Sequence, residues 1–345
     1  MIQAVDEYQD LLRASVATAG NDHRLGANEA PPAVVSIFLG DELTAVLDSL
    51  ENDVPYEAAE KTQMKLGAKV LPRFQRDTTD RNRTSPFAFT GNKFEFRMLG
   101  SSNSIACANI MLNSAVAQVL KEFADQLEGK EDFEAALHGL IRKTLKEHKR
   151  IIFNGNGYDD SWIKEAVEKR GLLNLRTTPD CMPCLFAEKN KKMLTGLKVY
   201  SPAELESRYE ILMENYCKAV TIEAHTMVDM AEKEIIPAIE AYIEALGSTA
   251  AAKKAVDGDL CCCYEKKRIS KLSALVDQID AAVDALDASL ITLGMTADIS
   301  AQAELIRDEV LPKMSLLRAP ADEAETLTAK KYWPFPTYGD LLFGV

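Results

Sequence analysis

The chain has 345 residues, with 47% hydrophobic and 27% charged side chains, so it is long enough to bury a sizeable core and to form two or three domains. Its formal net charge at pH 7 is −13, which argues against a broad surface for nucleic acid or for an anionic membrane, because such surfaces need an excess of lysine and arginine. No apolar run approaches the roughly 18 residues of a membrane-spanning helix.

The chain begins with helical and short strand-like patterns that we group as one domain, residues 1–128. Apolar residues recur on one helical face over residues 5–16, and Gly20-Asn21-Asp22 is predicted to end that helix. Residues 33–39 are apolar and β-branched and follow two prolines, which predicts a buried strand. Residues 42–50 return to helical spacing.

A hairpin is predicted where two aromatic runs flank a short turn. Its arms are residues 87–89 and 94–98, joined by Thr90-Gly91-Asn92. Side chains alternate between the two faces of a strand. Glu95 and Arg97 are therefore predicted to share one face, while the apolar residues of the second arm share the other.

Residues 104–127 and nearly all of the second predicted domain, residues 129–345, have helical spacing. The segment 131–149 is amphipathic, and residues 202–245 form a long helix that Pro237 is predicted to kink. A later apolar seam advances in alternating steps of four and three, as in a helical hairpin or coiled coil. Its members are Leu272, Val276, Ile279, Val283, Leu286, Leu290 and Leu293.

The C-terminal tail is the last distinctive segment. Residues 332–338 are aromatic and proline-rich, and we expect them to dock in an extended form against a core. The predicted fold class is α+β: a partial antiparallel sheet with packed helices, followed by a predominantly helical bundle. A bundle by itself indicates no function.

Seven cysteines form a poor disulfide framework, because the count is odd and three are consecutive; they indicate a reducing, cytoplasmic location. The first residues also lack the pattern of a signal peptide. Cys181 and Cys184 have zinc-knuckle spacing without a second pair nearby, and Cys261-Cys262-Cys263 is too compact for tetrahedral ligation. We therefore interpret both groups as small buried hydrophobic residues.

Two stretches contain residues that are hard to explain by structure alone. In the first, Arg24 and Glu29 lie five residues apart in a non-helical loop. In the second, Glu95 and Arg97 alternate on one strand face, near further arginines. A carboxylate can hold a divalent cation while guanidinium groups hold phosphate or carboxylate oxygens, so this pattern suits a metal–phosphate site. An ordinary surface ion pair explains the same spacing, because Glu-x-Arg is common.

Three motifs, in this order, resemble the C-terminal catalytic motifs of glutamine synthetases: residues 21–31 (NDHRLGANEAP), 82–87 (NRTSPF) and 93–97 (KFEFR). The TSPF wording, the helical extension and the tail YWPFPTYGDLL at residues 332–342 resemble the type III branch, and the resemblance covers essentially the whole chain. It implies ATP-dependent ligation of ammonia to glutamate through γ-glutamyl phosphate, with ATP and Mg²⁺ or Mn²⁺ as cofactors, as part of glutamine biosynthesis.

The resemblance implies a role for each matching residue. Glu95 would ligate the active-site metal ion that bridges to the nucleotide phosphates, and Arg97 would face the substrate glutamate and the transferred phosphoryl group. Arg83 would contact the nucleotide phosphates, and Lys93 occupies a position that is usually basic near ATP. Arg24 would bind a glutamate carboxylate.

Glu29 matches the glutamate of the family's mobile loop, which shields the intermediate and helps to deprotonate the attacking ammonium. One position departs from the family pattern. Most members have a second arginine where Ala88 stands here, so its phosphate contact would have to come from elsewhere, with Arg76 and Arg81 as the candidates.

The family's other metal carboxylates, its nucleotide-side histidine and its small N-terminal domain lie upstream of these motifs. One metal ligand cannot hold two hydrated divalent ions, so we expect this chain alone to lack synthetase activity. The expected partners are glutamate, ammonium, the N-terminal half of the same enzyme and, at full length, further copies in a ring. Two alternatives stay open: a non-catalytic assembly module built on the helical bundle, and an unrelated guanidino-kinase-like ligase.

Overall fold

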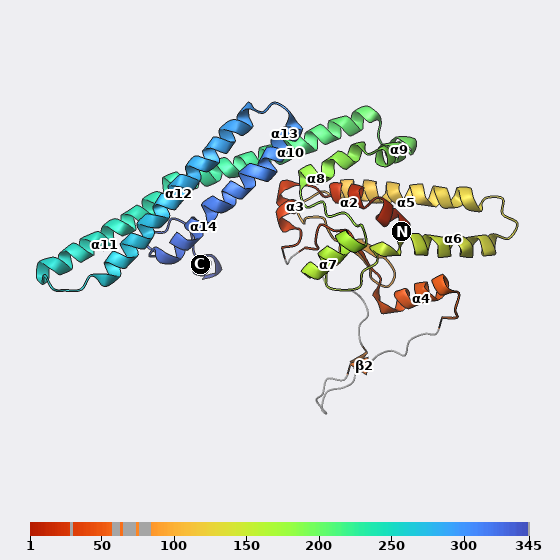
Figure 1. The fold of residues 1–345 in the computed structure, drawn as a ribbon, viewed down its shortest axis with the longest axis horizontal. Coiled ribbons are helices and arrows are strands. Elements are labelled where there is room, and N and C mark those ends of the chain that lie inside the picture. Colours follow the sequence, from red (N-terminus) through yellow and green to blue (C-terminus); the bar gives the residue numbers. More distant parts are fainter. Residues whose placement is uncertain (28–29, 57–62, 65–73, 76–83, 344–345) are drawn as a thin grey trace. The chain divides into compact units, whose positions relative to one another are not determined.

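The computed structural model describes residues 1–27, 30–56, 63–64, 74–75 and 84–343 (Figure 1). They form two compact units, Met1–Leu212 and Met213–Val345, and each is described by itself below. Helices predominate in both units and a small sheet lies in the first, which confirms the predicted α+β class. The domain division at residues 128/129 stays a prediction. Within the described ranges, no helix combines the length and apolar character needed to cross a membrane.

Unit 1 opens with three short helices: α1 (Ile2–Glu7), α2 (Gln9–Ala14) and α3 (Ala19–Arg24). The apolar residues predicted to share one helical face over residues 5–16 are buried, but the segment forms two helices that separate at Tyr8, and polar residues such as Asp10 and Arg13 are buried as well. The prediction that Gly20-Asn21-Asp22 ends the helix is wrong, because these residues lie inside α3. The hydroxyl of Thr18 accepts a hydrogen bond from the Asn21 backbone at 3.2 Å, so Thr18 caps a new helix after α2 has already ended.

The sheet of unit 1 has the order β1-β4-β5, with bounds β1 (Ile37–Phe38), β4 (Phe87–Phe89) and β5 (Phe94–Phe96). β4 and β5 pair antiparallel, with Ala88 opposite Glu95, which confirms the predicted hairpin. β1 pairs with β4 in parallel, so the sheet is mixed rather than wholly antiparallel. A separate antiparallel pair consists of β2 (Gln63–Met64) and β3 (Phe74–Gln75).

The strand predicted over residues 33–39 is much shorter than expected. Residues 33–37 are all buried, yet only two residues of the segment are in β1. β4 lies along β1 on one side, while on the other the Ile37 carbonyl accepts a hydrogen bond from the Phe153 amide at 2.8 Å. Apolar sequence therefore predicted the burial correctly, but it did not determine how many residues join the ladder.

Longer helices surround this sheet, and those predicted over residues 42–50, 104–127 and 131–149 are all confirmed. The bounds in unit 1 are α4 (Gly40–Asn52), α5 (Ala106–Leu127), α6 (Phe133–His148), η1 (Lys149–Ile151), α7 (Asp160–Lys164), the π-helical turn η2 (Glu165–Lys169), α8 (Thr178–Cys181), η3 (Met182–Phe186) and α9 (Glu188–Gly196).

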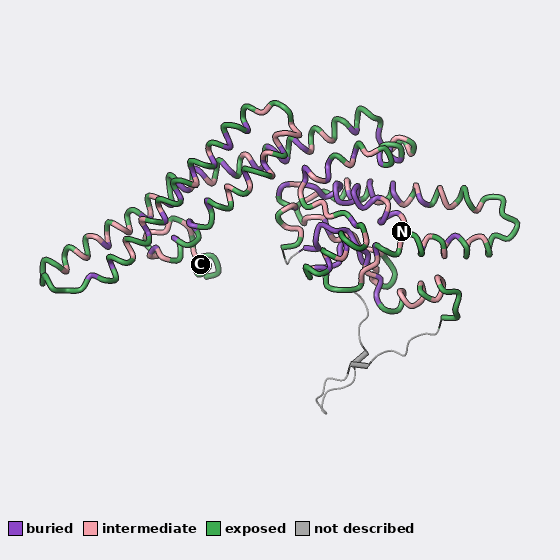
Figure 2. Tube along the Cα trace, in the orientation of Figure 1, coloured by how far each residue is buried: buried purple, intermediate pink, exposed green. Residues whose placement is uncertain are grey.

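The core of unit 1 draws on segments that lie far apart in the sequence (Figure 2). Trp162, which is 2% exposed, stacks on Phe153 with 3.6 Å between ring centroids. The guanidinium of Arg170 lies 4.9 Å from the Trp162 ring, so a cation covers this aromatic pair. The buried members of the core are Val5, Leu12, Val16, Val34, Val35, Ile37, Leu39, Phe87, Met98, Ala108, Ile151, Trp162, Ala166 and Leu172.

Unit 2 is helical, and the predicted long seam lies on its central helix. The remaining bounds are α10 (Pro202–Met230), which continues from unit 1, the π-helical turn η4 (Ala231–Ile235), α11 (Ile236–Val256), α12 (Cys263–Met295), α13 (Ile299–Leu305), the π-helical turn η5 (Ile306–Val310), α14 (Leu311–Leu327) and α15 (Tyr338–Phe343).

Helix α12 packs against both α11 and α14. Six of the seven predicted seam residues are buried, while Val276 is only half-buried and Leu275 is buried beside it. A helix with neighbours on two sides buries a wider stripe than the narrow seam of a two-stranded coiled coil. The second neighbour therefore explains the additional buried position.

Pro237 was predicted to kink the long helix, and the distortion takes the form of a π-helical turn. The turn η4 ends two residues before Pro237, and η5 ends two residues before Pro312 in the same way. Proline has no amide hydrogen to donate, and its ring collides with the carbonyl four residues earlier. A π-helical turn avoids this collision, because its hydrogen bonds span five residues rather than four and the carbonyl is displaced from the proline ring.

The first part of the C-terminal tail, residues 332–335, packs within unit 2 as predicted, whereas Tyr338 begins helix α15 and is 84% exposed. The ring of Tyr332 lies 5.3 Å from that of Tyr242 on α11. Trp333 and Phe335 border a mostly apolar cavity of about 280 Å³, together with Met227 and Leu317. The aromatic residues therefore anchor the segment that leads into α15.

Candidate functional site

The hairpin holds Glu95 and Arg97 side by side on one face. The Arg97 guanidinium lies 3.1 Å from a Glu95 carboxylate oxygen, measured from Nη2 to Oε2. On the opposite face, the Phe87 ring lies 5.5 Å from that of Phe94 and 5.9 Å from that of Phe96. Phe87 is fully buried, and Phe94 and Phe96 are half-buried against it, so the aromatic residues occupy one face of the hairpin and the acid and the guanidinium occupy the other. The predicted alternation is confirmed.

Glu95 is ionised and accessible in this arrangement, since its side chain is 37% exposed. The hydrogen bond from Arg97 lowers the pKa of Glu95 below its ordinary value, and the charge of Lys93, whose Nζ lies 3.5 Å from Glu95 Oε1, acts in the same direction. The stabilising effect of this pairing is present above the ordinary carboxyl range and is lost as the pH falls through the lowered pKa. At neutral pH the carboxylate can donate an oxygen to a cation.

The metal implied by the resemblance fits these residues only in part. Glu95 offers the hard oxygen that Mg²⁺ or Mn²⁺ prefers. The portion of the chain that the structure describes contains no group of three histidine, cysteine, aspartate or glutamate residues that could hold a metal ion. Glu95 can therefore supply one ligand, and the other ligands must come from elsewhere.

Arg24 ends α3 and lies beside the end of β5. Its Nη1 donates to the side-chain oxygen of Asn21 at 2.9 Å and to the carbonyl of Met98 at 3.2 Å. Because Met98 directly follows Arg97, these bonds hold the Arg24 guanidinium next to the strand that carries Glu95 and Arg97. Three of the predicted site residues thus lie in one region, although Arg24 precedes the strand by about 70 positions in the sequence.

The loop after Arg24 is closed at its base. Leu25 and Ala30 form a parallel bridge, and the Gly26 amide donates to the Pro31 carbonyl at 3.1 Å. Gly26 has φ +80°, a conformation that glycine adopts without strain and other residues do not. Glu29, which this loop carries, lies outside the described residues.

Several residues predicted to contact the nucleotide phosphates are not among those that the structure describes. Arg83 lies outside the described residues, as do Arg76 and Arg81, the two predicted substitutes for the arginine missing at Ala88. Ala88 itself is fully buried in the sheet. Lys93 belongs to the hairpin turn, and its side chain is 66% exposed.

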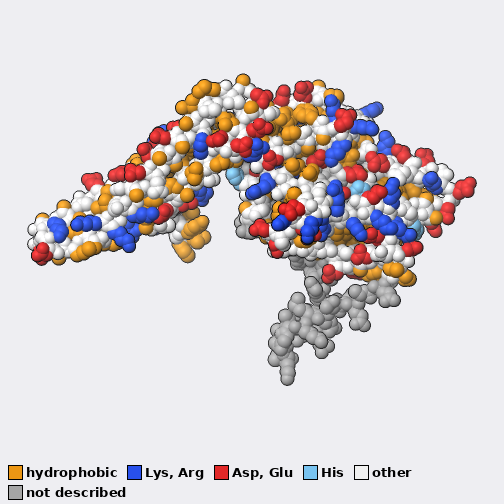
Figure 3. Space-filling model, viewed as in Figure 1, with side chains coloured by type: hydrophobic (Ala, Val, Ile, Leu, Met, Phe, Trp, Pro, Cys, Tyr) orange, Lys and Arg blue, Asp and Glu red, His pale blue; other side chains and the backbone are white. Residues whose placement is uncertain are grey.

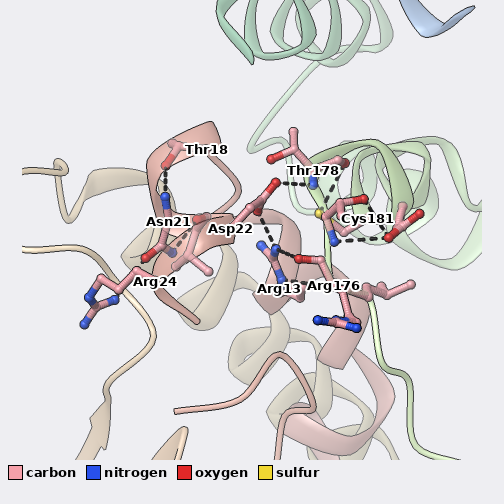
Figure 4. Close-up of polar contacts among 12 residues, drawn as sticks. Arg13, Thr18, Asn21, Asp22, Arg24, Arg176, Thr178 and Cys181 are labelled. Carbon is pink, nitrogen blue, oxygen red and sulfur yellow. Dashed lines mark hydrogen bonds and ion pairs between the residues drawn. The ribbon is translucent and has the colours of Figure 1, made fainter. Parts of the chain in front are cut away.

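A buried ion pair behind α3 was not predicted from the sequence (Figure 4). Arg13 is 1% exposed, and its Nη2 lies 2.6 Å from Asp22 Oδ1. The other oxygen of Asp22 accepts a hydrogen bond from the Thr178 amide at 2.6 Å. Burial raises the pKa of Asp22, while Arg13 and Thr178 act against that rise. Arg13 lies in the segment 5–16 but not among the residues of its predicted apolar face, so the sequence pattern did not indicate that this side chain is buried.

The cysteine predictions are half confirmed. Cys181 is buried, as predicted, while Cys184 is only half-buried; burial raises the pKa of Cys181 to about 12 and also raises that of Cys184, so both are thiols at neutral pH. The interpretation of Cys261-Cys262-Cys263 as buried residues is wrong for two of the three. Cys261 and Cys263 are exposed and joined by a disulfide, and only Cys262 is buried. The odd cysteine count gave no indication of this short link.

Cys181 is expected to resist alkylation in the folded protein. With a pKa of about 12, roughly one thiol in 10⁴ is ionised at pH 8, and burial blocks access to it as well. Iodoacetamide at pH 8 after mild reduction should label Cys261 and Cys263 first and Cys181 only after unfolding, as read by peptide mass spectrometry. Equal labelling rates for Cys181 and Cys263 in the native protein would contradict this.

Comparison with known proteins relates the chain to glutamine synthetases. Residues 136–254 match the glutamine synthetase C-terminal domain. The chain is 43% identical over 353 residues to a glutamine synthetase of Butyrivibrio fibrisolvens, covering 100% of this chain and 49% of the relative. The chain belongs to the glutamine synthetase family. This confirms the resemblance inferred from the three motifs.

Two further glutamine synthetases agree. A type-3 glutamine synthetase of Dictyostelium discoideum is 39% identical over 350 residues, with 99% of this chain and 48% of the relative covered. The glutamine synthetase of Bacteroides fragilis is 35% identical over 357 residues, with the same coverage. The chain spans about half the length of the curated relatives it matches.

Proposed function

We propose that this chain contributes part of the active site for ATP-dependent ligation of ammonia to glutamate through γ-glutamyl phosphate. The observation that carries this proposal is the pair formed by Glu95 on β5 and Arg97 directly after it, beside Arg24, in a chain whose entire length aligns with glutamine synthetases. Placing an acid and two guanidinium groups in one region suits a substrate that carries both carboxylate and phosphoryl oxygens.

Each described residue has a role that its chemistry supports. Arg24 binds a carboxylate of glutamate, and Arg97 stabilises the negative charge that develops on the phosphoryl oxygens during both steps of the reaction. Glu95 supplies one oxygen ligand to Mg²⁺ or Mn²⁺, and the bound ion would neutralise the phosphate charge. The two hydrogen bonds from Arg97 to Glu95 fix the direction of the Arg97 guanidinium before substrate binds.

Three further roles follow from the family motifs. Glu29 covers the intermediate and takes a proton from ammonium, Arg83 contacts the nucleotide phosphates, and Lys93 lies near ATP. For Lys93, the exposed position in the hairpin turn beside Glu95 supports a role at the edge of the site.

The partners proposed for the chain follow from its incomplete ligand set. The remaining metal ligands come from the N-terminal half of the same enzyme, and the full-length protein assembles into a ring of identical copies. We place the protein in the cytoplasm. Alone, the chain lacks synthetase activity, because one carboxylate does not hold the metal ions that the reaction needs.

Reconstitution tests this function. The chain alone should give no γ-glutamyl transfer, and mixing it with the N-terminal half of the same enzyme should give Mn²⁺-dependent transfer. Glu95→Gln should lower that activity about 10²-fold or more, because the ligand charge is lost while the shape is kept. Glu128→Gln, at the exposed end of α5, is the matched control and should change nothing. An inactive mixture of folded halves, or full activity of Glu95→Gln, would contradict the proposal.

One observation favours a second function, in assembly. Helix α15 exposes Tyr338, Leu341, Leu342 and Phe343 by between 66% and 84%, and hydrophobic side chains gather where it lies (Figure 3). Exposed apolar side chains in a group are typical of contact surfaces. If the chain forms oligomers that Leu342→Asp disrupts, yet the reconstituted mixture has no activity, assembly becomes the better assignment.

A further inference from the structure

Helix α3 is too short to hold its own orientation. It has six residues, and an isolated helix of this length does not form in water. Its direction, and with it the position of Arg24 at its last residue, must be set by contacts with the rest of unit 1. Those contacts therefore decide where the Arg24 guanidinium lies.

On one side of α3, the side chain of Asp22 connects the helix to the backbone of residues 175–178. Its two carboxylate oxygens are bonded to Arg13 and to the Thr178 amide, each at 2.6 Å. Arg13 in turn donates from Nε to the Leu175 carbonyl at 2.8 Å and from Nη2 to the Arg176 carbonyl at 2.9 Å. Residues 175–178 are thus linked to α3 through one buried ion pair.

On its other side, α3 is joined to the hairpin through Asn21. The side-chain nitrogen of Asn21, Nδ2, donates to the carbonyls of Val16 at 2.7 Å and Met98 at 3.0 Å. The Asn21 oxygen accepts from Arg24 at 2.9 Å. Asn21 and Asp22 are consecutive, and Figure 4 shows their side chains pointing to different sides of the helix, with Arg24 directed away from Arg13. The helix is therefore held from two directions.

We propose that Arg13 and Asp22 are positioning residues that hold α3 against residues 175–178 and so hold Arg24 in place for a glutamate carboxylate. This rests on the proposed function of Arg24. Residues 175–178 lie within the match to the glutamine synthetase C-terminal domain, so that part of the chain acts on the substrate side of the site through this ion pair. Removing one partner leaves the other charge buried and unpaired, which destabilises the attachment of α3 to residues 175–178.

The test compares single and double variants in the reconstituted mixture. Asp22→Asn keeps the shape of the side chain and removes its charge; it should raise KM for glutamate about tenfold while KM for ATP changes less than twofold, since a small displacement of a binding group lowers its effect strongly. Arg24→Ala should raise KM for glutamate at least as much. The double variant should be no worse than Arg24→Ala alone, because Asp22 acts through Arg24.

Two controls separate positioning from a general loss of structure. Asp132→Asn changes the N-cap of α6 in the same unit, where asparagine also caps, and should leave both KM values unchanged. Hydrogen exchange should show faster exchange of α3 amides in Asp22→Asn and unchanged exchange in α12. If Asp22→Asn does not fold, Arg13→Lys keeps the charge but loses the forked contacts, and the same shift in KM is expected.

The outcomes distinguish the two proposals. If Arg24→Ala raises KM for glutamate and Asp22→Asn and Arg13→Lys do not, positioning is overturned while the proposed function stands. Additive effects in the double variant would also overturn it, because they would show that Asp22 acts independently of Arg24. If Arg24→Ala leaves KM for glutamate unchanged, the role proposed for Arg24 fails and the positioning role fails with it.

Discussion

Replacing Arg97 with alanine is expected to lower kcat/KM for glutamate about 10²- to 10³-fold in the reconstituted enzyme. The loss of one preorganised charged donor aimed at developing negative charge has an effect of this size. Arg97 is held ready by its bond to Glu95, so its contribution does not depend on rearrangement during the reaction. Steady-state phosphate release measures the change, and Arg97→Lys should restore only part of the activity, because it lacks the planar fork.

The pH profile gives a second readout for the same variant. The Arg97 hydrogen bond is the main cause of the lowered pKa of Glu95, so its removal should move that pKa upward and shift the acid limb of activity to higher pH. Arg142→Ala removes a guanidinium from the exposed pair with Asp53 and is the matched control. A loss of less than threefold in Arg97→Ala would show that this guanidinium does not stabilise the reaction.

Leu12→Ala is expected to destabilise unit 1 by about 2–5 kcal/mol. Leu12 is fully buried in the core, and truncating such a side chain removes apolar contacts and leaves a cavity. The chain has two tryptophans, so a Trp333→Phe background leaves Trp162 as the fluorescence reporter of unit 1. Urea titration of that signal gives the free energy of unfolding.

Leu120→Ala in the same background is the matched control. Leu120 is 59% exposed on α5, and surface truncations change stability by about 0.5 kcal/mol or less. If the two alanine variants lowered the urea midpoint equally, the packing assigned to Leu12 would be wrong.

Local patterns predicted the elements whose structure depends on local sequence. The hairpin has alternating side chains and a glycine turn, and the helices over 104–127 and 131–149 have clear periodicity. The prediction failed where distant contacts decide the outcome. α3 forms through its Thr18 cap and its contacts on both sides, although its glycine and asparagine favour a turn.

The same distinction applies to the candidate site. Glu95 and Arg97 were placed together correctly, because two residues on one strand face are neighbours by geometry alone. The ion pair of Asp22 with Arg13 and its bond to Thr178, 156 residues away, have no local signature. The spacing of Arg24 and Glu29 drew attention to Arg24, but only the family resemblance implied its role, and the contact that fixes it beside β5 is with a carbonyl 74 residues away.

The π-helical turns before Pro237 and Pro312 imply that chain length is adjustable at two places in unit 2. Such a turn holds one residue more than an α-helical turn, and the helix on either side keeps its phase. Deleting one residue inside Ala231–Ile235 together with Pro237→Ala would therefore yield an uninterrupted helix with its downstream side chains still directed correctly, whereas the deletion alone would restore the collision of the Pro237 ring with the carbonyl four residues earlier. A deletion between residues 236 and 241 would rotate the rest of α11 by about 100° relative to the residues before it and carry Tyr242 away from Tyr332.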